Sequence, residues 1–247
     1  MRKDYRADLH VHTVLSPCAE IEMLPPLIVQ EALDHGIQII AITDHNASAN
    51  IAAVQFAARG TDLVVLPGME LQTQEEIHIL CLFDTLEQVA ELQKTVDRLL
   101  PPMVNDPEHF GVQLIVDAAG DLLGEEERLL LTSVQLSITE AFHLVASLDG
   151  LFIPAHINRK AYGLIEVLGF VPDDLPIEAL EISRHIKPGE VPRKFPQVTG
   201  YPLLQNGDVH RLDEFLGVNH FHIAAATIKE LRLAIHSQEG RNMSILA

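Results

Sequence analysis

Short apolar runs that lead into histidine or acidic residues alternate with helical patterns in the first half of this chain. The runs 37–42 and 63–66 are almost wholly apolar, which is typical of strands buried on both faces of a parallel sheet. Segments 25–35 and 50–59 follow helical patterns and each is followed by a glycine, the usual helix stop. This order predicts an α/β fold built on a parallel sheet or barrel.

The second half continues the pattern after one irregular stretch. Leu86, Val89, Leu92, Val96 and Leu99 recur at helical spacing, and a capping box at residues 137–140 predicts a helix through about residue 148. Further strands are expected at 151–155, 179–183, 202–206 and 220–224, with a final helix from residue 227. Residues 101–137 lack periodicity apart from a possible small hairpin, so we interpret them as an insertion in a single domain over residues 1–247.

The amino-acid composition bears on the cellular location of the protein and on the partners that it excludes. There are 17 Lys and Arg against 35 Asp and Glu, a formal net charge of −18. Such a surface repels polyanions, so we expect no long nucleic acid and no membrane as partner. Two cysteines make no disulfide framework, and no run reaches the roughly 20 apolar residues of a membrane span, so a cytoplasmic location is the simplest expectation. A small phosphorylated substrate is still compatible with this negative charge, because divalent ions bound at a site dominate the electrostatic field there. The sequence does not indicate an oligomeric state.

The motif Asp8-Leu9-His10-Val11-His12-Thr13 has the pattern of a metal-binding strand. Side chains alternate along a strand, so His10 and His12 project to the same face, about 7 Å apart. Alone, the motif would fit two solvated histidines on an edge strand better than a metal site. However, His, Asp or Glu recurs at the end of an apolar run at six further positions: His45, Glu70, His78, His156, Asp208 and His210. Barrels gather active-site groups at the C-terminal ends of their strands, and buried charges are costly without a metal.

Together these motifs resemble the PHP (polymerase and histidinol phosphatase) superfamily. The resemblance extends from His10-Val11-His12 through Asp44-His45, Pro67-Gly68-Met69-Glu70, His78 and His156 to Gly207-Asp208-Val209-His210. It implies a distorted (βα)7 TIM-like barrel, two or three divalent metal ions (zinc, manganese or iron), and hydrolysis of phosphoesters. A water bridging two ions about 3.5–4 Å apart would supply the attacking hydroxide.

Carried over to this sequence, the resemblance implies a set of ligands for each ion. His10, His12 and Glu70, with Asp208 or His210, would surround the first ion. Glu70 would bridge to a second ion bound by His78 and His156. His45, with Asp208 or His210, would contribute to a third. Cys18 stands where much of the family has His or Asp; it is either a thiolate ligand, which favours zinc or iron, or a small loop residue, and we prefer the ligand.

Three residues are assigned catalytic roles by the same resemblance and by chemistry. Glu70 would bridge the metals, and Asp44 would either orient a ligand or touch a metal. Arg159 is the best candidate by sequence to face the phosphate oxygens, ahead of Arg184 and Lys187, which fit a solvated surface position better. Cys81 lies in an apolar strand pattern and is expected in the core.

The leading functional hypothesis is hydrolysis of a small phosphomonoester, such as a nucleotide, a sugar phosphate or histidinol phosphate. An amidohydrolase-type enzyme is the first alternative, although its barrels often bridge metals with a lysine and no lysine ends a strand here. A non-catalytic metal-binding or polymerase-associated module is the second.

Overall fold

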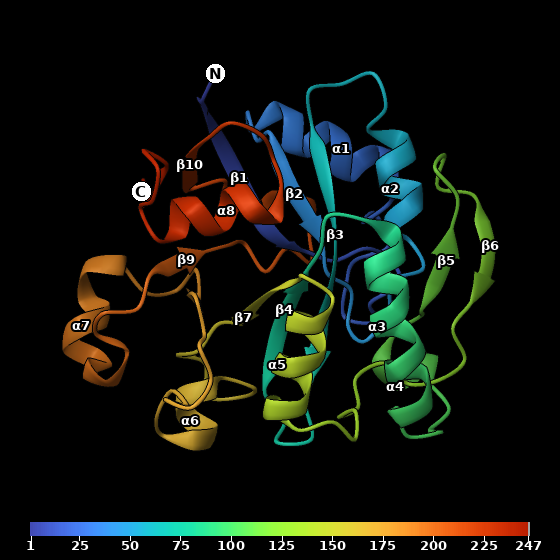
Figure 1. Ribbon diagram of the computed structural model, residues 1–247. Coiled ribbons are helices and arrows are strands. Elements are labelled where there is room, and N and C mark those ends of the chain that lie inside the picture. The colour runs from blue at the N-terminus through green and yellow to red at the C-terminus, as the bar shows by residue number, and fades with distance from the viewer. Residues whose placement is uncertain (247) are drawn as a thin grey trace.

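A curled seven-stranded sheet forms the centre of the computed structural model, which describes residues 1–246 (Figure 1). In spatial order its strands are β11 (Asn242–Ile245), β10 (Asn219–Ile223), β1 (Lys3–Val11), β2 (Ile39–Ile42), β3 (Val64–Gln72), β4 (His78–Leu82) and β7 (Leu151–Pro154). Only β1–β2 and β2–β3 pair in parallel; the other neighbours are antiparallel.

Helices cover the outside of this sheet, largely where the sequence predicts them. They are α1 (Pro25–Asp34), α2 (Ile51–Ala57), α3 (Leu86–Leu99), α5 (Ile138–Ser147) and α8 (Ile228–Ile235). The capping box is confirmed, because Ser137 Oγ accepts the amide of Glu140 and the Glu140 carboxylate accepts the amide of Ser137. Shorter turns were not predicted: α4 (Pro107–Phe110), α6 (Leu164–Leu168), α7 (Val191–Lys194) and 3-10 turns at Pro188–Glu190, Pro196–Val198 and Leu212–Glu214.

The expected regular alternation of parallel strands and helices is only partly right. The fold is mixed α/β, and the count of a (βα)7 barrel is not confirmed, since β8 (Leu180–Ile182) and β9 (Leu203–Gln205) form a separate parallel pair. Backbone hydrogen bonds cross the two gaps: Ile157 N donates to Glu181 O at 2.9 Å, and His12 N donates to Val209 O at 2.9 Å. The seven-stranded sheet and the β8–β9 pair are therefore joined at these two gaps by isolated backbone hydrogen bonds, and not by a continuous ladder.

The predicted hairpin within residues 101–137 is present but shorter than expected. Its strands are β5 (Leu114–Val116) and β6 (Leu122–Glu125), which pair only with each other. The Asn50 side chain fastens the hairpin to the main fold, donating to Leu114 O and accepting from Val116 N. The interpretation of this segment as an insertion in a single domain stays a prediction.

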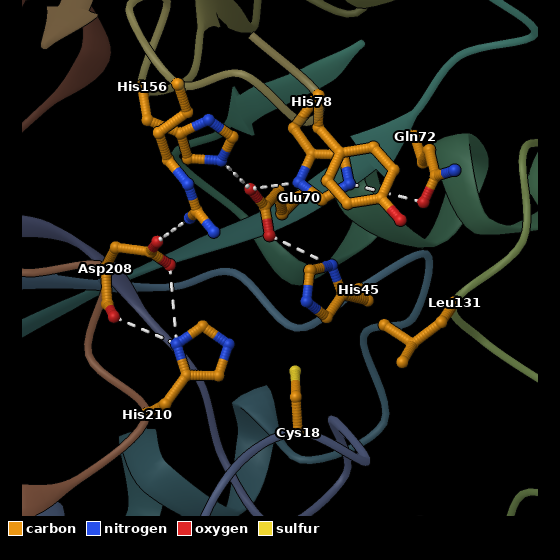
Figure 2. Close-up of a pocket in the computed structure, with 11 residues that line it drawn as sticks. Cys18, His45, Glu70, Gln72, His78, Leu131, His156, Asp208 and His210 are labelled. Atoms are coloured by element: carbon orange, nitrogen blue, oxygen red, sulfur yellow. Dashed lines mark hydrogen bonds and ion pairs between the residues drawn. The ribbon is translucent and has the colours of Figure 1, made fainter. Parts of the chain in front are cut away.

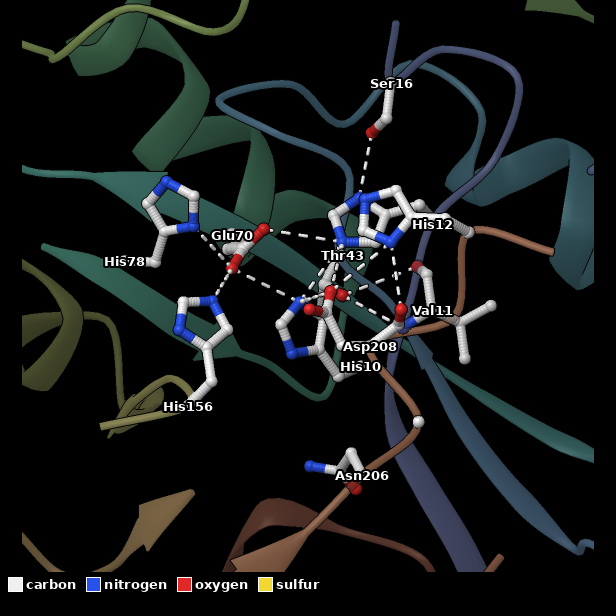
Figure 3. A network of polar contacts seen from close by, with 12 residues as sticks. His10, Val11, His12, Ser16, Thr43, Glu70, His78, His156, Asn206 and Asp208 are labelled. Carbon is white, nitrogen blue, oxygen red and sulfur yellow. Dashed lines mark hydrogen bonds and ion pairs between the residues drawn. The ribbon is translucent and has the colours of Figure 1, made fainter. Parts of the chain in front are cut away.

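Alternation along β1 places apolar side chains and the histidines on opposite faces. Tyr5, Ala7 and Leu9 are buried in an apolar cluster that includes Phe221 of β10 and Leu231 of α8. His10 and His12 are also fully buried, and Figure 3 shows their rings among Glu70, Asp208 and the other polar side chains of the site. Among the described residues no helix combines the length and apolar character needed to cross a membrane. The cytoplasmic location stays a prediction.

Candidate metal centre

The carboxylate of Glu70 lies at the centre of a cluster of buried imidazoles (Figures 2 and 3). Oε1 is 2.8 Å from His78 Nδ1, 3.0 Å from His156 Nε2 and 3.3 Å from His10 Nε2. Oε2 is 2.9 Å from His45 Nδ1 and 3.4 Å from His12 Nε2. Five imidazoles from four segments of the chain thus meet one carboxylate whose side chain is 1% exposed.

Strand direction explains how Glu70 and His78 meet. The expectation that both residues end a strand is wrong, because β3 continues beyond Glu70 to Gln72 and His78 is the first residue of β4. Because β4 runs antiparallel to β3, its first residue lies beside the last residues of β3, with Gln72 paired to His78. His78 therefore reaches the site from the start of a strand and not from its end.

Asp208 and His156 enter the site from left-handed backbone positions. Their φ angles are +51° and +29°, a region that L-residues rarely adopt and that costs roughly 1–3 kcal/mol. Asp208 Oδ1 lies 3.3 Å from His10 Nε2 and 3.5 Å from His12 Nε2. Both strained residues thus supply side chains to the same cluster.

Three groups of donor atoms are close enough to hold metal ions. They are His10, His12, Glu70 and Asp208; His45, Glu70 and His78; and His12, His45 and His210. The atoms within each group lie within 4.8 Å of one another. Figure 2 shows His156 beside the second group, with its Nε2 on Glu70 Oε1. The first group matches the expected first ion, whereas His45 takes the place expected for His156 in the second.

The donor set fits divalent ions. Two buried atoms that face each other, His45 Nδ1 and Glu70 Oε2, have no hydrogen-bond partner among the described residues although they are 2.9 Å apart. Buried polar atoms are nearly always satisfied, so such atoms indicate a missing ligand. Imidazole nitrogen with carboxylate oxygen suits zinc, manganese or iron.

Burial shifts the ionisation of this cluster. It lowers the pKa of His78 to about 4, and burial together with the charge of His210 lowers the pKa of His12 well below its usual value. Both rings are therefore neutral at neutral pH, the form that binds metal. Burial alone would raise the pKa of Glu70, but the surrounding His78, His10 and His45 lower it well below its usual range.

Cys18 directs its sulfur toward His45 and His210 (Figure 2), although the residue as a whole is exposed. Burial of the sulfur would raise its pKa, but the charge of His45 and a hydrogen bond from His210 outweigh this and lower the pKa to about 6. Cys18 is not part of the three groups above. Its place in the cavity lining is compatible with either interpretation of the sequence, ligand or loop residue.

Asp44 does not reach the cavity, so the alternative of direct metal contact is not met in this structure. Its Oδ1 accepts hydrogen bonds from Thr13 N and Ser16 Oγ, both at 2.7 Å, and its Oδ2 accepts one from Thr13 Oγ1. Ser16 Oγ in turn lies 2.9 Å from His12 Nδ1. Asp44 is therefore better described as a positioning residue that acts on His12 through Ser16, in place of the catalytic assignment.

Arg159 lies at the cavity as expected, but it is already paired. Its Nη1 donates to Asp208 Oδ2 at 2.6 Å, while Asp208 Oδ1 faces the histidines. Arg184 lines only a neighbouring cavity, and Lys187 is exposed and lines neither.

The sequence reasoning missed Glu181, which lies behind the cluster. This buried carboxylate is 3.0 Å from His10 Nδ1 and accepts hydrogen bonds from His156 N at 2.7 Å and Asn206 Nδ2 at 2.8 Å. It thereby connects three of the segments that form the site. An acidic residue at the centre of the apolar run 179–183 was the signal that could have identified it.

The cluster borders a cavity of about 210 Å³. Beyond the candidate ligands it is lined by Gln72, Leu131, Arg159 and Tyr162. The Tyr162 ring stacks parallel on His78, with centroids 4.3 Å apart and planes 7° apart. The candidate ligands that line the cavity therefore share it with one polar, one apolar, one basic and one aromatic side chain.

Several solved structures share this fold. A lesion-specific endonuclease Q from Pyrococcus furiosus superposes with a TM-score of 0.72 at 20% identity, covering 98% of this chain and 58% of that one. A protein from Bifidobacterium adolescentis named as a metal-dependent phosphoesterase gives 0.56 at 18% identity, covering 83% and 87%. An amidohydrolase from Chromobacterium violaceum gives 0.58 at 19%, covering 86% and 90%. At these identities the likeness shows the fold alone, and this chain spans little more than half of the endonuclease.

The expectation, drawn from the net charge, that this chain has no long nucleic acid as a partner is contradicted by a protein of the same fold. Endonuclease Q has been solved in complex with a 27-mer duplex substrate with an abasic lesion at the active site, and that structure gives a TM-score of 0.71 at 20% identity, covering 98% and 58%. Net charge is a sum over the whole molecule and does not describe the field at one site. Residues 159–211 contain seven Lys and Arg and seven Asp and Glu, so the whole excess of 18 negative charges lies elsewhere.

Sequence comparison identifies the family. No curated protein matches this sequence significantly. The PHP domain model matches residues 8–164, which contain the His10-Val11-His12 motif, Glu70, His78 and His156. The chain therefore belongs to the PHP domain family.

Proposed function

We propose that this chain is a metal-dependent phosphoesterase. The observation that carries the proposal is the buried Glu70 carboxylate within 3.4 Å of five imidazoles, shared by two of the three donor groups. A carboxylate shared between two groups is suited to bridge two ions. His10, His12, Glu70 and Asp208 would bind one ion, and Glu70, His45 and His78, with His156 adjacent, a second; His12, His45 and His210, with Cys18 beside them, are candidates for a third.

The chain's own residues would position the substrate around this centre. When bound, paired divalent ions generate a nucleophile from water at neutral pH and neutralise charge on a phosphoryl group. Arg159 orients Asp208 and keeps further N–H donors for the non-bridging phosphate oxygens. Asp44, through Ser16, fixes the ring of His12, and Glu181 fixes the ring of His10.

The form of substrate that we propose first is a small phosphomonoester. A cavity of about 210 Å³ accommodates a phosphate and part of its leaving group. Because endonuclease Q shares the fold and acts on DNA, oligonucleotides with an abasic site belong in the same substrate panel.

An amidohydrolase reaction is the second candidate, since the Chromobacterium violaceum protein has this fold. The cavity lining of the described residues contains no lysine, the residue that often bridges metals in amidohydrolases. This favours the phosphoesterase.

A substrate panel with and without chelator tests the proposal. We expect phosphate release, or strand cleavage, that disappears with chelator and returns with zinc, manganese or iron. His12→Ala and Asp208→Ala should abolish it. Turnover of cyclic amides alone would favour the amidohydrolase. Inertness towards every substrate with metal fully bound would favour a non-catalytic module.

A further inference from the structure

Asp8 begins the strand motif that carries His10 and His12, yet its carboxylate belongs to none of the three groups of candidate metal ligands. The side chain is fully buried in β1. The donors that reach it are backbone amides of one segment of the chain. A buried charge is costly unless hydrogen bonds compensate it, so the carboxylate and these amides stabilise each other.

The amides that donate to Asp8 come from both ends of one loop, residues 207–217. At the start of the loop, Gly207 N donates to Oδ1 at 3.0 Å and to Oδ2 at 3.2 Å. At its end, Leu216 N donates to Oδ2 at 2.9 Å and Gly217 N donates to the same oxygen at 3.4 Å. One carboxylate therefore closes the loop by holding its two ends together.

Glycine at each end allows this closure. A Cβ on Gly207 would lie 3.1 Å from Asp8 Oδ2 and 2.5 Å from Glu214 O, so only glycine lets the backbone come this close. Gly217 has a φ angle of +56°, and a Cβ there would lie 2.6 Å from a side-chain carbon of Ile37. Both ends of the loop are therefore shaped by their contacts with β1 and its surroundings.

The loop carries two of the candidate metal ligands. Asp208, directly after Gly207, belongs to the first donor group, and Figure 3 shows it beside His10 and His12. His210 belongs to the third donor group. The second group has no member in the loop and consists of His45, Glu70 and His78. A displacement of the loop would therefore affect the first and third groups and leave the second in place.

Other hydrogen bonds attach the middle of the loop to β1 independently of Asp8. Val209 N donates to His10 O at 3.0 Å, and His12 N donates to Val209 O at 2.9 Å. Asp208 lies between this attachment and the end that Asp8 holds, and its backbone is left-handed. Such a conformation persists only where the surrounding structure imposes it. Asp8 supplies part of that constraint, and the loop keeps its other attachments when Asp8 is replaced.

We propose that Asp8 is a positioning residue for the metal centre. By closing loop 207–217 it directs Asp208 and His210 towards the ions of the first and third donor groups, and it contacts no ion itself. This inference rests on the proposed function, because it assigns those groups to metal ions. Residues that hold metal ligands in place typically contribute 10- to 100-fold to metal affinity.

Zinc titration of the metal-free protein, followed by calorimetry, tests this role. Asp8→Asn preserves the volume and one acceptor oxygen, whereas Asp8→Ala removes both acceptors. Asp4→Asn is the matched control, because Asp4 lies on the same strand, is 77% exposed and pairs with His222. Asp208→Asn and His78→Gln each alter one ligand, and so identify the binding steps of the first and second groups.

We expect Asp8→Asn to weaken the first-group step at least about tenfold, and Asp8→Ala to weaken it further. The second-group step should stay within twofold of the wild type, and Asp4→Asn should leave both steps unchanged. When Asp208→Asn is already present, Asp8→Asn should weaken the first-group step by less than threefold, because two changes that act through one ligand are not additive.

Three results would overturn the positioning role. They are unchanged zinc binding in both Asp8 variants, equal weakening of the two steps, which indicates a general loss of folding, and full additivity with Asp208→Asn. Circular dichroism checks that each variant is folded, and Asp8→Asn decides the question if Asp8→Ala is not.

Zinc binding requires no turnover, so this proposal and the proposed function can fail separately. If no substrate is hydrolysed but Asp8→Asn selectively weakens the first-group step, the role of Asp8 stands and the proposed reaction is wrong. If substrates are hydrolysed and Asp8→Asn binds zinc as the wild type does, the role of Asp8 is wrong and the reaction stands.

Discussion

Replacing Glu70 with glutamine should remove more than one metal ion. The variant preserves the volume of the side chain but loses the charge that lies within 3.4 Å of five imidazoles. Loss of a residue that merely supports a ligand already costs 10- to 100-fold in metal affinity. We therefore expect at least about 100-fold weaker binding, or about 2.8 kcal/mol, at each ion that Glu70 contacts.

The consequence can be measured as stability as well as metal content. At a free metal concentration of 100 Kd, one site stabilises the wild type by about 2.7 kcal/mol, which raises Tm by roughly 5–10 °C for a chain of this size. With affinity 100-fold weaker, the same metal stabilises the variant by only about 0.4 kcal/mol. Thermal melts with and without chelator, together with elemental analysis, should show both effects.

Glu76→Gln is the matched control, because Glu76 is exposed on the turn between β3 and β4 and lines no part of the metal cavity. It should keep the wild-type metal content and the same metal-dependent rise in Tm. A Glu70→Gln protein that retains all its ions with unchanged affinity would refute the bridging role of Glu70.

Three further predictions concern individual residues. Cys18→Ser should weaken the binding of one ion, whereas Cys81→Ser, in the core, should leave the metal content unchanged. Identical metal content in the wild type and both variants would show that Cys18 is a loop residue and not a ligand. The folded-state pKa of His78 is about 4, below its unfolded value of 6.5, so its neutral form favours folding at pH above 6.5. As the pH falls from 6.5 to 4, the unfolded state takes up the proton first, and the free energy of unfolding decreases by about 3 kcal/mol. In chemical denaturation of the metal-free protein, this decrease should be smaller in His78→Gln than in the wild type. Gly207→Ala places a Cβ 2.5 Å from a backbone oxygen and should destabilise the fold by about 1–3 kcal/mol in chemical denaturation, whereas Gly189→Ala, with open space around it, should change stability little.

The individual elements of the fold followed from local patterns. Helices such as Leu86–Leu99 and Ile138–Ser147 were predictable because their spacing and caps are encoded in a few neighbouring residues. The antiparallel course of β4 was not, because a buried apolar strand has the same sequence pattern in either direction. That direction brings His78 beside Glu70.

The separate roles of the polar residues depended on distances that a sequence does not contain. Asp44 follows an apolar strand as His45 does, yet its carboxylate is turned toward Thr13 and Ser16 and away from the cavity. Glu181 gave only a weak signal, since one acidic residue in a short apolar run has many explanations. Its contacts with His10 and His156 required three segments to meet.

The sequence by itself determined which residue types are available and that they lie within or beside apolar runs, since spacing and burial patterns are local properties of the chain. Only the tertiary structure decided that Glu70 is shared between donor groups and that Arg159 is paired with Asp208. It also showed why a total charge of −18 does not describe the site. Electrostatic interactions fall off with distance and are screened by water and salt, so the few charges that folding brings close together determine the local field.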